Sequence, residues 1–509
     1  MRYAFILLVV FLSSFFLCSC EDFLTEEPET EVTNNNFWKT EKDLEVGVNG
    51  MYKVFRFNHG DNVTVHLRDR GLVFDGLGSW LKPSNNDLSG AWGQSSCTHW
   101  EMDYQVIMST NLVLDNLSRA EGVSAERYGF YEGQALALRA YMYFYIARHW
   151  GDVPLILHVE DVGEKARTPW QDVLDVCIRD LKQAASELPV ATGMKDSDGN
   201  PVTSKLFISK GTCHAILAHA LAWKAGLNNE PGLNREAILY CDSVISDNSY
   251  ALAGSVKEVC ERVILGNSAE GIFEADYEDT EYDLKMKGSY LAGYCQFWPI
   301  VPSLTAASAR RGLTISNKAV YALYPDERDQ RRVEYFYKLD SMANVSTSTT
   351  RGNAYVQKYR HTLLYTSGSN VGKMRAYEDN EIIIRLADII LLRAELKNKT
   401  GDVAGAIKDL NRIRERAGCS PYSGAVDGDL ANAIQDERDR EFFCEGISTR
   451  YFDIVRNGMF RERLRGNFKT LTDRDVEDGA LFVPIGEGAF FNNTLMRQTP
   501  YWKRNGFDN

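Results

Sequence analysis

Residues 135–146 are the stretch that most constrains how this chain can fold. Arg139 is the only charged residue among them, so a helix here has no polar face. Such a helix must be covered nearly all round by other elements, which places it inside a larger helical assembly. We expect it to end at Gly151, which can adopt the left-handed conformation of a C-cap, while Pro154 prevents its continuation.

Two later stretches share a helix–turn–helix pattern. Residues 214–245 form one unit, with a turn after Gly226, and residues 382–416 form the other, broken at Gly401. Units of this size are typical of tetratricopeptide repeats, although a plain antiparallel helix pair has the same pattern. Two alike units, with further pairs expected in the first half, favour a mainly α fold on a tetratricopeptide-like helical-repeat scaffold.

Two regions interrupt the helical pattern. Residues 61–100 are rich in Gly, Asn, Asp and Trp without a sustained period, which indicates a long loop region. Residues 338–376 are rich in Ser, Thr, Gly and Tyr, and we expect short strands and loops there. Residues 104–117 follow a helical pattern. The scaffold therefore carries long loop-rich and short β insertions.

The composition is that of a folded protein, and its negative charge does not favour binding to polyanions. Of the 509 residues, 25% are charged and 44% are hydrophobic, and the formal net charge is −13. Nucleic acid or an anionic membrane surface needs a basic patch, so neither is expected as the main partner. No segment after residue 20 approaches a membrane-spanning run.

Residues 1–19 read as a secretory signal, because a positive Arg2 precedes an apolar run too short to span a bilayer. Residues 17–20 resemble a bacterial lipobox, in which the signal is cut before a cysteine that then carries lipid. Cys20 is thus the predicted lipidation site, and the acidic residues 20–40 are the predicted flexible tether. An ordinary secretory signal followed by a spare cysteine is the alternative.

The remaining cysteines are widely scattered, without a CxxC pair. We expect buried free thiols for most of them, and one disulfide bridge stays open because connectivity cannot be read from sequence. These cysteines are Cys97, Cys177, Cys213, Cys241, Cys260, Cys295, Cys419 and Cys444.

Catalytic and metal-binding motifs are mostly incomplete. The glycines before Lys373 stand one residue short of a P-loop, and residues 196–200 resemble a calcium loop whose required Gly is replaced by Pro201. His214 and His219 lie five apart and share a helix face poorly, which favours a structural role. A carboxylate pair for glycoside hydrolysis stays open, because such pairs meet only in the fold. We expect no enzyme activity, cofactor or metal site.

Several segments, in order along nearly the whole chain, carry a family resemblance. They are residues 111–115, 135–145, 150–155, 180–189, 209–211, 384–398 and 437–456. Together behind a lipobox, they resemble the SusD/RagB family of surface glycan-binding lipoproteins. Gln134, where the family usually has Glu, and residues 447–449, longer than the usual single residue, are departures that touch scaffold motifs only.

The resemblance implies one SusD-like domain over residues 41–509, with an N-terminal half at 41–265 and a C-terminal half at 266–509. It implies a non-enzymatic receptor, lipid-anchored in the outer membrane and facing the exterior. Such a receptor captures an oligosaccharide and delivers it to a SusC-like TonB-dependent transporter. Peptide or protein ligands, imported by the same kind of complex, are the alternative.

Charged residues of the C-terminal motifs are expected to hold helices together. Arg385 and Asp388 are spaced for one helical face, and Glu381 lies four residues before Arg385, so we expect these three to pair with one another. Glu437 and Glu441 belong to a similar series with Glu445, Arg438 and Arg440. Buried charges need such partners.

Two regions have the side chains that a sugar site needs. Aromatic rings stack on the flat C–H faces of sugars, and polar side chains bind the hydroxyl groups. Trp100, by contrast, begins a helical pattern and is expected in the core. The predicted ligand-binding residues are Asp69, Arg70, Trp80, Asn86, Asp87 and Trp92 in the first region, and Tyr290, Tyr294, Phe297 and Trp298 in the second.

Overall fold

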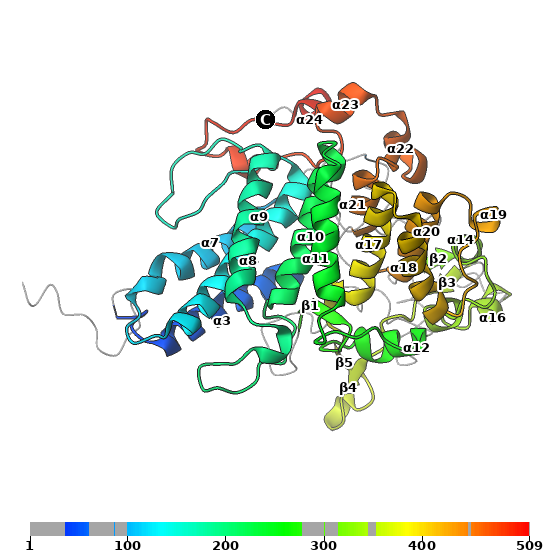
Figure 1. Cartoon of the computed structure of the whole chain (residues 1–509), viewed down its shortest axis with the longest axis horizontal. Coiled ribbons are helices and arrows are strands. Elements are labelled where there is room, and N and C mark those ends of the chain that lie inside the picture. The colour runs from blue at the N-terminus through cyan, green and yellow to red at the C-terminus, as the bar shows by residue number, and fades with distance from the viewer. Residues whose placement is uncertain are drawn as a thin grey trace, which may run out of the picture.

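Long helices stand side by side across the molecule, each packed against the next (Figure 1). The computed structural model describes residues 36–60, 86, 99–276, 300, 314–344, 353–445 and 449–507. The helices of this row are α7 (Glu101–Asn116), α8 (Ala125–Trp150), α9 (Trp170–Glu187), α10 (Lys210–Leu227), α11 (Gly232–Ile245), α17 (Leu386–Thr400) and α18 (Val403–Arg416). The predicted mainly α, helical-repeat fold is confirmed.

The central helix α8 is buried along most of its length, as its composition predicts. Ser124 caps its start by accepting a hydrogen bond from the Arg127 amide at 3.2 Å. The helix ends at Gly151, whose N–H donates to the Ala147 carbonyl. The predicted left-handed cap is wrong in detail, because Gly151 has a φ of 71° but a ψ of −119°. The ring of Phe482 lies where a side chain at Gly151 would stand, which excludes larger residues.

The two predicted helix pairs are α10–α11 and α17–α18. Asp402 caps the start of α18 through the Gly405 amide, and Gly401 before it takes the left-handed conformation. The second pair begins later than predicted, however. Residues 381–385 are strand β6 (Glu381–Arg385), which pairs antiparallel with β1 (Gly271–Ala275).

Helix α3 and several shorter elements complete the described part of the fold. Helix α3 (Glu41–Gly60) packs against α7 and α8. Strands β2 (Thr314–Ser316) and β3 (Asn353–Tyr355) form one antiparallel ribbon, and β4 (Thr362–Leu364) and β5 (Met374–Tyr377) form another. The prediction of short strands and loops over 338–376 is confirmed from residue 353 on, whereas residues 339–343 form helix α16 and residues 345–352 lie outside the described structure. The short helices are α12 (Val256–Glu258), α14 (Asn317–Leu323), α15 (Arg331–Glu334), α16 (Leu339–Ala343), α19 (Gly424–Asp427), α20 (Leu430–Glu441), α21 (Thr449–Arg456), α22 (Phe460–Arg463), α23 (Asp473–Glu477) and α24 (Pro500–Arg504).

The main apolar core fills the space between the long helices, and a smaller core lies under α14, α15 and β3. Trp100 is buried against Trp150 in the main core, as predicted. Trp38 is also buried there, so the folded body already includes this end of the predicted tether. Free thiols are found at Cys177, Cys213, Cys241, Cys260, Cys419 and Cys444, whereas Cys97 and Cys295 lie outside the described residues. Among the described helices, none is long and apolar enough to cross a membrane.

A cluster of buried ion pairs centres on Arg385. Its guanidinium contacts the carboxylates of Glu270 and Glu441 at 2.6 Å each and that of Glu445 at 2.7 Å. Arg416 bridges Glu270 and Glu441 from the other side. The predicted pairing of Arg385 with Asp388 and Glu381 is wrong, because Arg385 is the last residue of a strand and its partners come from other elements.

Asp388 belongs to a second buried cluster. It accepts hydrogen bonds from His219 at 2.7 Å and from Arg438 at 2.6 Å, and Arg438 also contacts Asp453 at 2.7 Å. Burial alone would raise the pKa of Asp388, but its interactions with His219 and Arg438 hold that pKa well below its usual range. His219 therefore has the structural role expected of it, tying α10 to α17.

Arg385→Met should lower the free energy of unfolding by about 3–5 kcal/mol, because it leaves buried carboxylates without a cation. Urea unfolding followed by circular dichroism measures this loss. Arg474→Met is the matched control, since the Arg474 side chain is 75% exposed and should leave the unfolding midpoint nearly unchanged. Equal losses in the two variants would contradict the role given to Arg385.

Candidate functional site

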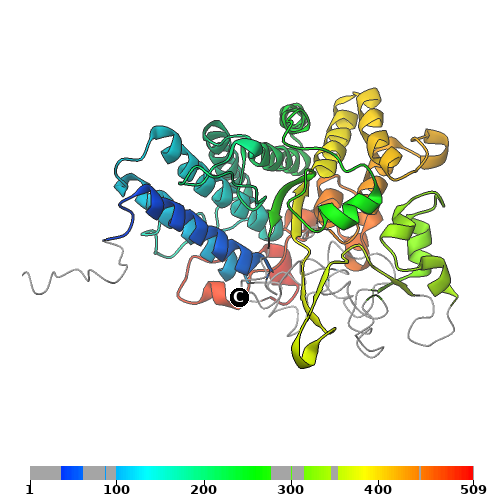
Figure 2. The same ribbon diagram turned by 90° about the horizontal axis from the view of Figure 1, so that it is seen from below.

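The end of helix α3 packs directly on the end of strand β1. The rings of Phe55 and Phe273 stack at 5.7 Å with an interplanar angle of 11°. At the next residue of α3, the Arg56 guanidinium lies 3.5 Å from the carboxylate of Asp276, the residue that follows β1. Figure 2 shows α3, in blue, reaching β1, in green, at this point.

The same end of α3 also holds the start of α7. The Asn58 side chain donates to the Met102 carbonyl at 2.6 Å. The end of α3, the start of α7 and the end of β1 therefore form one junction. The described chain stops at residue 60 and, apart from residue 86, resumes at residue 99 beside this junction, and it stops again after residue 276 there. The two regions predicted to bind ligand follow these points in the sequence.

Most of the predicted contact residues lie outside the described part of the chain. Asn86 is the exception: its side chain is buried, and its amide donates to the Ala480 carbonyl at 3.3 Å. In this position Asn86 joins its region to the C-terminal segment. Outside the described residues are Cys20, Asp69, Arg70, Trp80, Asp87, Trp92, Tyr290, Tyr294, Phe297 and Trp298.

Asp103 is a buried carboxyl at this junction that the sequence analysis missed. Its Oδ2 atom is buried and has no hydrogen-bond partner within the described structure. Burial raises the pKa of Asp103 to about 8, and the nearby charge of Glu101 adds to the effect. The signal was present, because Asp103 lies four residues before buried Ile107 on the core-facing side of α7.

Among the described residues, no group of three or more His, Cys, Asp or Glu side chains is placed to hold a metal ion. The calcium-like segment, residues 196–200, is an exposed turn. Asp196 accepts hydrogen bonds from the amides of Asp198 and Asn200 at 2.9 and 2.7 Å, which occupies its carboxylate with the turn's own backbone.

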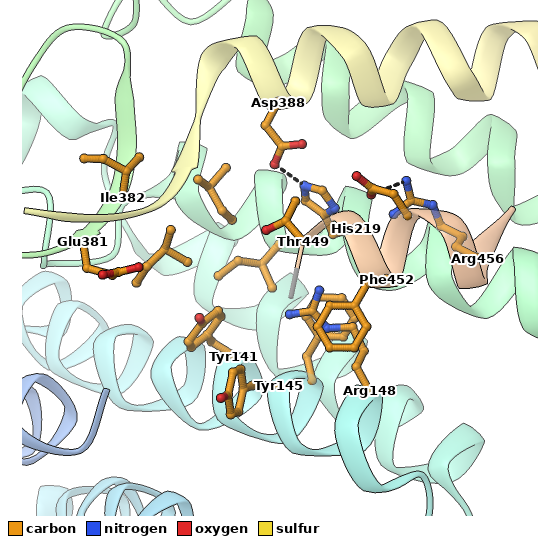
Figure 3. Close-up of a pocket in the computed structure, with 15 residues that line it drawn as sticks. Tyr141, Tyr145, Arg148, His219, Glu381, Ile382, Asp388, Thr449, Phe452 and Arg456 are labelled. Atoms are coloured by element: carbon orange, nitrogen blue, oxygen red, sulfur yellow. Dashed lines mark hydrogen bonds and ion pairs between the residues drawn. The ribbon is translucent and has the colours of Figure 1, made fainter. Parts of the chain in front are cut away.

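A cavity of about 50 Å³ lies between α8, β6 and α21 (Figure 3). Tyr141 and Tyr145 line one side of it, and the His219–Asp388 pair lines another. Pockets that enclose whole small molecules have volumes of ~300–1,000 Å³. This cavity is therefore too small to hold an oligosaccharide.

Comparisons with known proteins match both ends of the chain. A family model described as "SusD family" matches residues 305–502, and a model described as "Starch-binding associating with outer membrane" matches residues 22–196. The chain belongs to the SusD family.

Relatives of this SusD-family protein align with it over most of their length. SusD-like protein P38 of Formosa agariphila is 25% identical over 506 residues, covering 88% of this chain and 92% of its own. Among solved structures, a SusD homolog from Bacteroides thetaiotaomicron has a TM-score of 0.74 at 22% identity, covering 92% of this chain and 99% of its own. Surface glycan-binding protein A from the same species, solved in complex with laminarihexaose, has a TM-score of 0.69 at 18% identity, covering 91% of this chain and 100% of its own.

Asp103→Asn should stabilise this SusD-family protein increasingly as the pH rises. Asp103 has a pKa of about 8 in the folded state against 3.8 for an ordinary Asp, so between these values the folded state binds one more proton than the unfolded state. Stability of the wild type is therefore lost as the pH rises from about 4 to 8, and the variant lacks this term. The gain should be small at pH 4 and grow by at most about 1.4 kcal/mol for each pH unit until it levels off above pH 8. Urea unfolding at several pH values measures it, and a gain that does not depend on pH would contradict the prediction.

Proposed function

We propose that this protein is a cell-surface glycan-binding lipoprotein, which captures an oligosaccharide and delivers it to a SusC-like TonB-dependent transporter. Carbohydrate binding is supported at the level of the family, by the starch-binding description of the N-terminal model and by the glycan-bound structural neighbour. Delivery to a transporter and the choice of oligosaccharide are the proposal's own steps.

The observation that carries the proposal is that the described chain stops after α3 and after β1 beside one junction, ahead of the two aromatic-rich regions in the sequence. A site that recognises a sugar needs aromatic rings and polar groups on the same side of the protein, held by a rigid base. The stacked Phe55–Phe273 pair and the Arg56–Asp276 contact supply that base. Trp80 and Trp92 in one region, and Tyr290, Tyr294, Phe297 and Trp298 in the other, are the proposed ring contacts, with Asp69, Arg70 and Asp87 as polar contacts.

Attachment to the outer membrane follows from Cys20 in the proposal. Lipid on Cys20 would hold the folded body near a transporter, with the residues up to Trp38 as the connection. The N-terminal family model is described as associating with the outer membrane, which supports this location. Lipid anchoring and the transporter partner rest on the lipobox and the family resemblance.

Trp80→Ala and Trp92→Ala should each weaken glycan binding about fivefold, since a stacked ring contributes about 1 kcal/mol. A glycan array that includes laminarihexaose selects the probe, and isothermal titration calorimetry with that probe measures the affinity. Phe491→Ala is the matched control, because Phe491 is a 76% exposed aromatic outside the two regions.

Unchanged affinity in both Trp variants would contradict the assignment of Trp80 and Trp92 as ligand contacts. An array without binding, together with capture of peptides, would replace glycan by peptide as the ligand. Release of shortened products from the bound glycan would show an enzyme and contradict the proposal as a whole.

Cys20→Ala should abolish surface anchoring and glycan uptake while leaving affinity unchanged, because the lipid is attached far along the chain from the binding regions. Labelling with a radioactive fatty acid and fractionation of membranes measure anchoring, and calorimetry on the released protein measures affinity. A variant that still fractionates with the outer membrane would contradict the assigned anchor.

A further inference from the structure

The small cavity between α8, β6 and α21 is partly open to solvent. Most of its lining side chains are buried, but Arg148, Ile383 and Thr449 are only half-buried and form its mouth. A single water needs ~10–15 Å³ of such space, so about 50 Å³ admits a group of three or four non-hydrogen atoms.

Arg148 is the unusual member of this lining. Its guanidinium lies between two rings, 3.9 Å from the centroid of Phe144 and 4.4 Å from that of Phe452. It makes no hydrogen bond or ion pair with any residue that the structure describes, and its Nε atom is buried without a partner. Cation–π contacts hold the group in place but leave its hydrogen-bond donors unused.

Nearby carboxylates are already committed to other cations. Asp388 is bound by His219 and Arg438, and Asp453 is bound by Arg438 and Arg456. The acid at the far end of the cavity, Glu381, lies beside Tyr141, whereas Arg148 lies beside Phe452 (Figure 3).

Burial lowers the pKa of Arg148 only to about 10, so the group stays charged at neutral pH. The buried Nε–H of Arg148 has no acceptor and the charged group has no counterion among the described residues, which is costly, and an anion that binds beside it offsets that cost.

We propose that this cavity binds a carboxylate group on Arg148. A guanidinium fits a carboxylate through two parallel N–H···O bonds, and the three heavy atoms of a carboxylate match the size of the space. The group could belong to a small free acid, which would enter whole, or to a uronic acid, whose ring would stay at the mouth. Tyr141 of the cavity packs against Phe55 and Phe273 of the junction, but the proposal rests on Arg148 and on none of the predicted sugar contacts, so it does not depend on the proposed glycan site.

Differential scanning calorimetry of the purified protein tests the proposal, with sodium acetate replacing sodium chloride at constant ionic strength. The melting temperature should rise saturably, by about 1 °C when acetate is tenfold above its dissociation constant. Arg148→Met keeps the length of the side chain between the two rings and should lose this rise. Arg235→Met, an exposed arginine of α11, is the matched control and should keep it.

A second variant guards against misfolding of Arg148→Met. Thr449→Trp narrows the mouth but leaves Arg148 in place, and it should also lose the response to acetate. Sodium glucuronate, compared with neutral glucose, distinguishes the two sources of carboxylate: a response to it places uronic acids among the ligands, and a response to acetate alone restricts the site to small free acids. An acetate response that is equal in the wild type and Arg148→Met, or a rise in chloride as large as in acetate, would overturn the proposal.

Discussion

The buried ion pairs around Arg385 and Glu441 are the interaction on which the C-terminal part of this structure depends. Removing several charges from water costs several kcal/mol for each ion, and only complete pairing offsets that cost. Arg385 at the end of β6, Arg416 at the end of α18 and Glu441 at the end of α20 can pair only when all three elements are in place. The network therefore favours one arrangement of strand β6, helix α18 and helix α20.

The buried ion pairs also connect the two apolar cores. Arg331, from the smaller core's α15, contacts Glu437 at 2.8 Å and Glu441 at 3.2 Å, so the same carboxylates face both cores. The smaller core is thereby fixed relative to the helical row by charge pairing as well as by apolar contact. Since Glu441 accepts from Arg331, Arg385 and Arg416, its pKa is held well below the usual range in spite of burial.

The helical part of the fold could be predicted from local patterns, because capping residues, apolar periodicity and the nearly uncharged stretch of α8 act over short distances. Strand β6 could not be found by the same reasoning. The spacing of Glu381, Arg385 and Asp388 fits one face of a helix, whereas the three consecutive isoleucines 382–384 favour a strand. The partners of Arg385 were also out of reach, since Glu270 lies 115 residues away in the chain.

The candidate site divides in the same way. Its proposed aromatic contacts come from composition and stay a prediction, whereas the junction of α3, α7 and β1 depends on contacts such as that between Arg56 and Asp276, which no local pattern reports. Asp103 and Arg148 were missed for a related reason. Each looks like an ordinary charged residue on a helix until burial and the absence of a described partner are known.

With the shared junction of α3, α7 and β1, the stability of the fold and its proposed ligand preference can change independently in evolution. Closing a loop of twice the length costs only about 0.6 kcal/mol, so either region can gain or lose residues at little expense to the fold. Asn58 and Arg56 tie the end of α3 to the start of α7 and to the end of β1, next to these regions in the sequence. Under the proposed function, a lineage carrying this scaffold can therefore exchange one sugar specificity for another by altering these regions.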